Sequence, residues 1–234
     1  MTYWSGLLRA RLPSAGPPRR LAGSGFMLGT TAMGTGGMMA RISYVDPGTV
    51  SDPELAGYLA DAREHGTPRL ESQAIRAHVP AVLRTFSQSW QQVFRDGVLD
   101  HRVKELARVF IAKSLDCGYC AAQRSGLAAA QGLDERAFDE VIDFRQSQLL
   151  TARDKAALRW AEAIAWDPAL ADDDLWSELH RHFTEPELVE LGSFIGLTMG
   201  QQRFLKTLGV RHGDLGRDSL AGLASDAAAA LAAS

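Results

Sequence analysis

Signals for the start and the end of helices recur along this chain from residue 51 to residue 209, and no strand pattern competes with them. Asp52 followed by Pro53 combines a capping side chain with a first-turn proline, and Thr184–Glu187 has the form of a capping box. Between such signals apolar residues recur at the three- and four-residue spacing of one helix face. The sequence therefore predicts an all-α fold of antiparallel helix pairs, with no sheet.

Capping residues and glycines bound the individual helices that we expect. In order along the chain, they run from Pro53 to Gly66, Arg69 to His78, Pro80 to Asp96, Asp100 to Leu115, Cys120 to Gly132, Asp134 to Ile142, Thr151 to Ile164, Leu175 to Leu179 and Thr184 to Gly209. The last of these is expected to be the longest. The apolar stripe of the third helix is predicted to face the core and comprises Val82, Leu83, Phe86, Trp90 and Phe94.

Composition divides the chain into three parts. Residues 1–40 contain no Asp or Glu and are rich in Gly, Ser, Pro and Met, so we interpret them as a disordered leader or as a mis-set start before Met38 and Met39. An export signal or a transit peptide is the alternative. Residues 41–213 are predicted to form the helical domain, and residues 214–234 a tail that is frayed or disordered.

The charge balance and the cysteine count exclude several classes of protein. A net charge of −3 gives no reason to expect a nucleic-acid partner, and no apolar run is long enough to span a membrane, so we expect no membrane partner either. Two closely spaced cysteines cannot join distant segments, which excludes a secreted disulfide scaffold and favours a reducing compartment, the cytoplasm. No glycine fingerprint follows a strand, so we expect no cofactor.

The two cysteines of the chain, Cys117 and Cys120, are separated by two residues, and Gly118 between them allows the chain to turn. A pair at this spacing can close into a disulfide, and the start of a helix favours the reactive thiolate. A redox dithiol is therefore the leading interpretation. Two alternatives stay open: the cysteines are buried small apolar residues, or they are half of a zinc site. The histidines that would complete a zinc site are His101, His180 and His182.

An acidic residue precedes the cysteine pair on the preceding predicted helix. If the chain turns there and the next helix folds back antiparallel, Cys120 and Arg124 approach Glu105. A carboxylate in that place can take the thiol proton, directly or through water. The alternative is an exposed helical glutamate paired with Arg102 or Lys104.

These residues together resemble a known family. The segments Val103–Ala107 and Asp116–Cys120, with Arg124, resemble the carboxymuconolactone decarboxylase superfamily, in particular its AhpD-like alkylhydroperoxidase branch. The resemblance extends more loosely over residues 41–209. It implies an AhpD-like helical domain that assembles as a homo-oligomer, a trimer or a larger ring.

The resemblance also implies roles for individual residues. Glu105 would belong to a proton relay, Cys120 would be attacked by a hydroperoxide, and Cys117 would convert the sulfenic acid into a disulfide. A dithiol or thioredoxin-like reductant would then restore both thiols.

The chain departs from that family at two positions. Arg124 stands where the best-studied branch has a relay histidine, and Tyr119 stands where a histidine can lie between the cysteines. Arginine cannot act as a base, but its charge can hold a thiolate. Arg124 is therefore interpreted either as a catalytic residue or as an ion-pair partner of Glu105, and Tyr119 as a packing residue.

Three functions follow from these observations. The first is a thiol-dependent peroxidase or disulfide oxidoreductase with Cys120, Cys117, Glu105 and Arg124 as its catalytic residues. The second is a carboxymuconolactone decarboxylase-like lyase, against which the dithiol counts. The third is a non-enzymatic helical oligomer that senses redox state. Four aromatic residues are candidates for a pocket lining or for the core, namely Trp90, Phe110, Phe144 and Trp160.

Overall fold

The computed structural model of the protein describes residues 40–216 and 221–233, so the expected leader lies outside the described residues except for Ala40. Within them the chain forms helices joined by turns, with one isolated antiparallel bridge, and the predicted all-α fold is confirmed. The α-helices are α1 (Pro53–His65), α2 (Leu70–Arg76), α3 (Pro80–Ser89), α4 (His101–Ser114), α5 (Gly118–Ala121), α6 (Gly126–Ala130), α7 (Glu135–Asp139), α8 (Ala152–Ala165), α9 (Asp173–His182), α10 (Glu185–Leu208) and α11 (Ser225–Ala233). A π-helix, η2 (Trp90–Arg95), continues α3, and the short 3-10 helices are η1 (Pro47–Thr49) and η3 (Pro168–Leu170).

The capping residues start these helices as predicted. Asp52 and Asp100 accept hydrogen bonds from backbone N–H groups in the first turns of α1 and α4. Thr151 and Thr184 form capping boxes at α8 and α10. Helix α10 ends at Gly209, whose φ of 67° is unfavourable for residues with a Cβ, and with 24 residues it is the longest helix in the described part.

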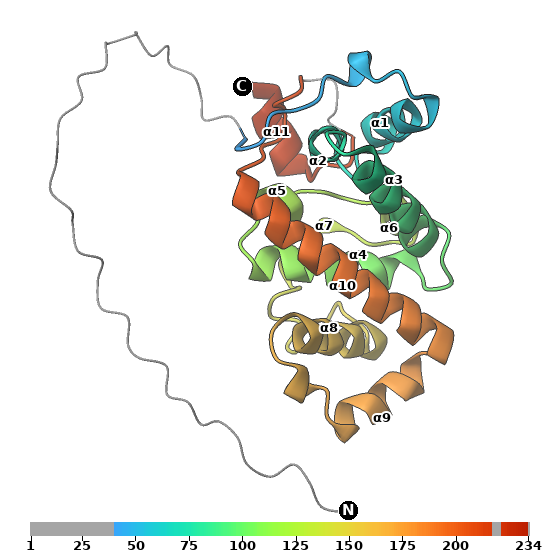
Figure 1. The fold of residues 1–234 in the computed structure, drawn as a ribbon. Helices are drawn as coiled ribbons and strands as arrows, with labels where there is room; N and C mark the ends of the chain where they lie inside the picture. Colours follow the sequence, from blue (N-terminus) through green and yellow to red (C-terminus); the bar gives the residue numbers. More distant parts are fainter. Residues whose placement is uncertain (1–39, 217–220, 234) are drawn as a thin grey trace, which may run out of the picture. The chain divides into compact units, whose positions relative to one another are not determined.

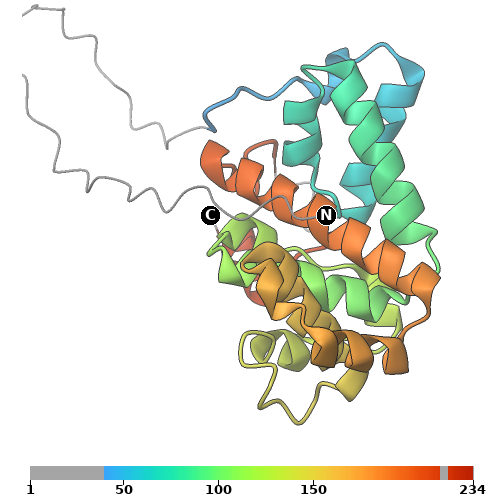
Figure 2. The same cartoon turned by 60° about the horizontal axis from the view of Figure 1, so that its bottom comes forward.

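Helix α4 lies at the centre of the packing. Helices α8 and α10 both pack against it, and α10 passes in front of it in Figure 1 and lies beside it in Figure 2. Every residue from Val103 to Ala112 is buried. Because α4 is enclosed on all sides, it carries Lys104, Glu105 and Arg108 into the interior, where charged groups need partners.

The apolar stripe of α3 and η2 faces the core except at one position. Val82 has an exposed fraction of 49%. It precedes the buried Leu83 by one residue, about 100° around the helix, so the prediction that Val82 faces the core is wrong. The rings of the stripe pack against α10 in an aromatic cluster made of Phe86, Trp90, Phe94 and Phe194.

The C-terminal part of the described chain packs beside the segment that joins α5 to α6. The N–H group of Arg124 donates to the carbonyl of Gly222 over 2.7 Å, and the N–H group of Ala224 donates to the carbonyl of Ala122 over 2.8 Å. This short pairing surrounds the bridge between Gln123 and Leu223 and leads into α11. The domain boundaries at residues 41 and 213 stay a prediction.

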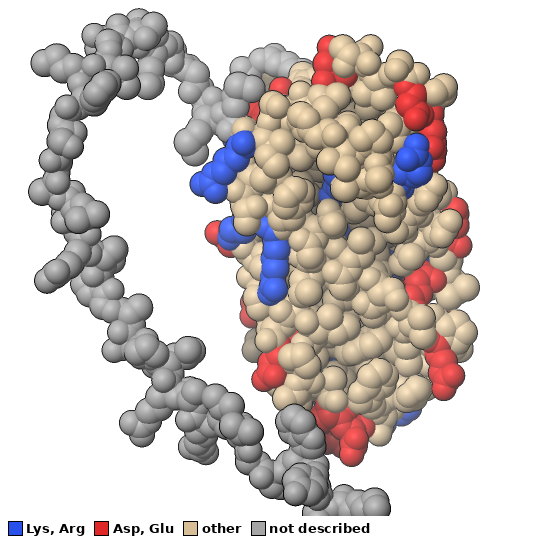
Figure 3. Space-filling model, viewed as in Figure 1, with Lys and Arg blue, Asp and Glu red and all other residues tan. Residues whose placement is uncertain are grey.

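The surface of the described residues carries charges of both signs. On the face shown in Figure 3, acidic and basic side chains lie mostly towards the edges, and uncharged residues cover the middle. Within residues 40–216 and 221–233, no helix has both the length and the apolar character needed to cross a membrane.

Candidate redox-active site

The two cysteines form a disulfide where α4 turns into α5. Cys117 is the N-cap residue of α5, its N–H group donates to the carbonyl of Ala112, and its Cα lies 5.3 Å from that of Cys120. Both residues are buried, with exposed fractions of 4% and 2%. The sequence therefore correctly predicts a pair within bonding reach at the start of a helix.

The turn before this pair occurs two residues earlier than predicted. Asp116 adopts a φ of 51°, in the left-handed region that Asp and Asn tolerate better than most other residues. Gly118 instead begins α5 with an ordinary φ, and a Cβ at this position would meet no atom within 4 Å. The expectation that Gly118 provides the turn is therefore wrong, because Asp116 adopts the left-handed conformation at which the chain turns.

The single helix expected from Cys120 to Gly132 is wrong as well. The chain forms α5 and α6, with an interruption between them. Ser125 caps α6 by accepting a hydrogen bond from the N–H group of Ala128, and the pairing of Gln123 with Leu223 requires extended backbone. Local capping and a distant segment thus end the helix early.

Glu105 is fully buried and forms an ion pair with Arg108, one turn further along α4. Arg108 Nε donates to Glu105 Oε2 and Arg108 Nη2 to Glu105 Oε1, each over 2.7 Å. The N–H group of Ser125 adds a third hydrogen bond to Oε1, over 2.9 Å. The alternative of an exposed glutamate paired with Arg102 or Lys104 is therefore wrong, because those two side chains pair with other carboxylates.

Arg108 connects this ion pair to the cysteines. Its Nη1 donates to the carbonyl of Cys120 over 2.8 Å, and its Nη2 donates to the carbonyl of Gln123 over 2.6 Å. The segment after the disulfide is thereby held against α4, and Glu105 reaches Cys120 through Arg108. Sequence reasoning missed Arg108, although its three-residue spacing from Glu105 is a recognised signal for a helical ion pair.

Arg124 lies on the outer side of this segment, away from Glu105. Its guanidinium pairs with Glu135, with N–O distances of 2.9 and 2.8 Å, and lies 4.3 Å from the ring centroid of Phe138. The predicted pairing of Arg124 with Glu105 is wrong. Because α5 ends at Ala121, the one-turn spacing that would place Arg124 beside Cys120 does not apply.

Tyr119 is buried between two groups that sequence reasoning did not connect with the cysteines. Its O–H group donates to Glu71 Oε2 over 3.3 Å, and its ring stacks on the ring of His212 with 4.4 Å between centroids. Burial, with the nearby Glu71 carboxylate, raises the pKa of Tyr119 well above its ordinary value. The phenol therefore stays protonated, and the expected packing role is consistent with its burial.

Protonation of His212 is expected to make the stability of the folded protein depend on pH. Burial, followed by the charge of Arg69, lowers the pKa of His212 from 6.5 to about 4, and neither ring nitrogen has hydrogen-bond geometry to a protein atom. The folded protein thus binds the proton more weakly than the unfolded chain does, so stability is lost as pH falls below about 6.5.

We expect the free energy of unfolding to fall by about 2 kcal/mol between pH 7.5 and pH 5 from this group. Urea titrations at the two pH values measure the change. The variant His212→Phe should lose this part of the pH dependence, and an unaltered dependence in that variant would contradict the assignment.

A small cavity lies against Cys120. Its volume is about 30 Å³, and Arg76, Arg108 and Gln202 are among the residues that line it. Arg76 has an exposed fraction of 4% and donates to the side-chain oxygens of Gln73 and Gln201, over 3.0 and 2.8 Å. Burial lowers its pKa to about 10. Trp90 also lines this cavity, whereas Phe110 and Phe144 are core residues.

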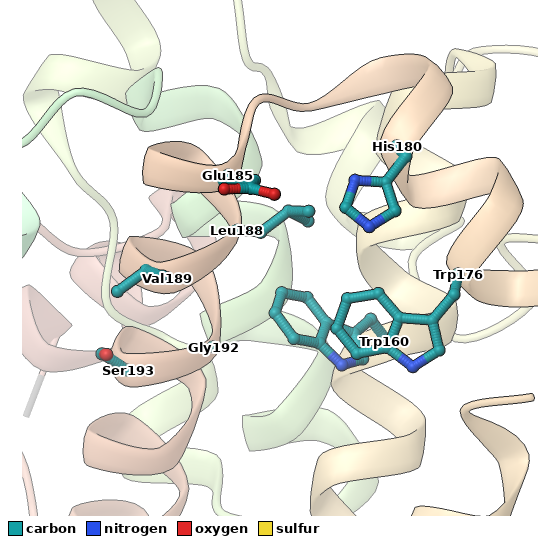
Figure 4. A pocket seen from close by; sticks show the side chains of 8 residues that line it. All are labelled: Trp160, Trp176, His180, Glu185, Leu188, Val189, Gly192 and Ser193. Carbon is teal, nitrogen blue, oxygen red and sulfur yellow. The ribbon is translucent and has the colours of Figure 1, made fainter.

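A wider pocket lies elsewhere, between α8, α9 and α10. Its volume is about 470 Å³, and Figure 4 shows Trp160 and Trp176 lining it opposite Val189 and Ser193 of α10. It shares no lining residue with the cavity beside Cys120. Within the described residues no group of three or more His, Cys, Asp or Glu side chains could hold a metal ion.

Comparisons with known proteins show what the segment that carries this site is similar to. Residues 80–163 match the carboxymuconolactone decarboxylase family. The chain is 37% identical over 99 residues to the uncharacterized protein Rv2313c of Mycobacterium tuberculosis, and 34% identical over 106 residues to the uncharacterized protein YnjA of Escherichia coli. These matches cover 42% and 45% of this chain, but only 35% and 58% of the two relatives.

Solved structures resemble the fold over a longer stretch. The alkylhydroperoxidase AhpD core of a peroxidase-related protein from Ralstonia eutropha JMP134 matches with a TM-score of 0.65 and 16% identity, covering 76% of this chain and 95% of that one. The debrominase Bmp8 matches with a TM-score of 0.60 and 17% identity, covering 77% of this chain and 91% of that one. The segment that contains Glu105 and both cysteines therefore matches the carboxymuconolactone decarboxylase family, and the fold of the chain is the all-α fold of the AhpD-like proteins.

Proposed function

We propose that the protein is a thiol-dependent peroxidase or disulfide oxidoreductase that uses Cys117 and Cys120 to reduce hydroperoxides. The observation that carries the proposal is the buried disulfide whose Cys120 carbonyl is held by Arg108, itself paired with the fully buried Glu105. A dithiol can cycle only if both sulfurs remain within bonding reach after reduction. The family match and the peroxidase-related structural neighbour support the same activity.

The chemistry needs two sulfurs, one hydroperoxide and a two-electron donor. The Cys120 thiolate attacks the terminal peroxide oxygen, the O–O bond breaks, and the departing alkoxide takes the proton released by the thiol, leaving Cys120 as a sulfenic acid. The Cys117 thiol then attacks that sulfur, forming the disulfide and releasing water. A dithiol or thioredoxin-like reductant restores both thiols by exchange.

Glu105 and Arg108 act in this proposal as positioning residues. The Glu105 carboxylate already accepts three hydrogen bonds, two from Arg108 and one from Ser125, so it acts on Cys120 through Arg108 and the backbone. Holding the Cys120 carbonyl keeps α5 folded back on α4 when the disulfide opens. A role for Arg124 would run through its contacts with the backbone after Cys120.

The test uses the fact that the chain has two cysteines in all. We expect Cys120→Ser to abolish peroxide consumption in the presence of a dithiol. Cys117→Ser should leave a sulfenic acid on Cys120 that a dimedone probe captures and mass spectrometry detects. Full peroxide turnover by either variant would contradict the proposal.

The same assay separates the other two functions. Slow, stoichiometric oxidation of the wild type without turnover would favour a redox sensor. Activity towards a carboxylated lactone that survives the loss of both cysteines would favour a lyase. The homo-oligomer implied by the family resemblance is a further part of the proposal, and light scattering of the full chain measures it.

A further inference from the structure

The cavity beside Cys120 contains a buried positive charge that no carboxylate balances. Arg76 takes part in none of the ion pairs among the described residues, and its two hydrogen-bond acceptors are the neutral amides of Gln73 and Gln201. The guanidinium lies 3.6 Å from the ring centroid of Phe86. Its Nε has no hydrogen-bond partner among the protein atoms described. A buried cation without an anion is costly, so its retention calls for an anion that is present at some stage of function.

The surroundings of the cavity leave one place for that anion. Arg108 also lines it, but Glu105 balances the charge of Arg108. Helix α10 contributes only uncharged side chains, from Thr198, Gln201, Gln202 and Leu205, and Tyr119 of α5 stays protonated. The sulfur of Cys120 is therefore the one lining group in the described structure that gains a negative charge when the disulfide is reduced.

We propose that Arg76 is the counter-ion of the reduced Cys120 thiolate, and that the cavity is the subsite where the head of a small hydroperoxide meets this sulfur. A volume of about 30 Å³ is room for about one water-sized molecule, so it suits the small head of a peroxide rather than a larger ligand. Gln202 Oε1 is a buried acceptor without a protein donor, so it suits the peroxide O–H group. The subsite rests on the proposed function, whereas the pairing of Arg76 with the thiolate does not require it.

The pairing is tested on the thiol itself, without peroxide. In the full chain carrying Cys117→Ser, Cys120 is the remaining thiol, and its thiolate is followed by absorbance at 240 nm or by the rate of alkylation with iodoacetamide against pH. We expect a pKa below the ordinary thiol value of about 8.5. Adding Arg76→Gln should raise that pKa by about one unit or more, which lowers the alkylation rate at pH 6.5 by about tenfold.

Two further variants make the outcome decisive. Gln201→Glu keeps the shape of the side chain and places a carboxylate on Arg76, which already donates to Gln201 Oε1 over 2.8 Å, so it should raise the thiol pKa as Arg76→Gln does. Arg84→Gln removes an exposed arginine of α3 and should leave the thiol pKa unchanged. An unshifted pKa in folded Arg76→Gln, or in Gln201→Glu if Arg76→Gln fails to fold, would overturn the pairing.

Peroxide consumption is measured separately, so the two proposals can fail independently. If Arg76→Gln shifts the thiol pKa but the wild type does not turn over peroxide, Arg76 is still the counter-ion, whereas the peroxidase function and its subsite are contradicted. Normal turnover, together with a thiol pKa that does not change in Arg76→Gln, would support the peroxidase function and contradict the role of Arg76 as counter-ion. For the subsite, Gln202→Leu should raise the KM for hydrogen peroxide more than it lowers kcat, and an unchanged KM would contradict it.

Discussion

Glu105→Ala is expected to lower the free energy of unfolding by about 3–5 kcal/mol. The substitution leaves the Arg108 guanidinium buried without an anion, and it removes the acceptor of the Ser125 N–H group. Removing one member of a buried ion pair costs more than the pair itself contributes, because the remaining charge stays away from water. Urea denaturation of the wild type and the variant measures the loss.

A double-mutant cycle distinguishes this cause from loss of packing. We expect Glu105→Leu combined with Arg108→Met to be less destabilising than the sum of the two single changes, because no buried charge remains. Arg84→Ala breaks an exposed pair with Glu54 and should change the stability little. Equal effects of Glu105→Ala and Arg84→Ala would mean that the buried pair does not hold the fold together.

Phe194→Ala is expected to destabilise the protein by about 3–5 kcal/mol for a different reason. The ring is fully buried and lies 5.3 and 5.8 Å, between centroids, from the rings of Phe94 and Trp90. Its removal leaves a cavity between α10 and η2, and the surrounding rings can collapse into it only in part.

Phe204 provides the matched control for this prediction. It lies on the same helix but is 42% exposed, so Phe204→Ala should change the free energy of unfolding by about 0.5 kcal/mol or less. Chemical denaturation of both variants makes the comparison. Since Trp90 lines the cavity beside Cys120, Phe194→Ala should also slow peroxide consumption, whereas Phe204→Ala should not.

The features that the sequence predicted well are those set by neighbouring residues. Helix starts at Asp52, Asp100 and Thr151 follow from side chains that accept hydrogen bonds from backbone N–H groups two or three positions away. The same holds for Cys117 and Cys120, whose spacing already brings the sulfurs within reach of each other.

The features that it missed depend on segments far apart in the chain. The helix after Cys120 was expected to continue because nothing near it signals the pairing with Leu223. That wrong expectation placed Arg124 beside Glu105, where Arg108 stands instead. Arg76 precedes the family match and has the sequence signature of an ordinary surface arginine, so its burial follows only from the packing of α2 against its neighbours.

The short pairing of residues 122–124 with residues 222–224 has a consequence for synthesis in the cell. A chain emerging from the ribosome acquires its cysteines long before Gly222 and Ala224, the residues whose backbone groups bond to Arg124 and Ala122. Until those later residues are made, the segment just after the cysteines lacks these two backbone partners. Residues 122–124 therefore take up their final pairing only after residues 222–224 have been made.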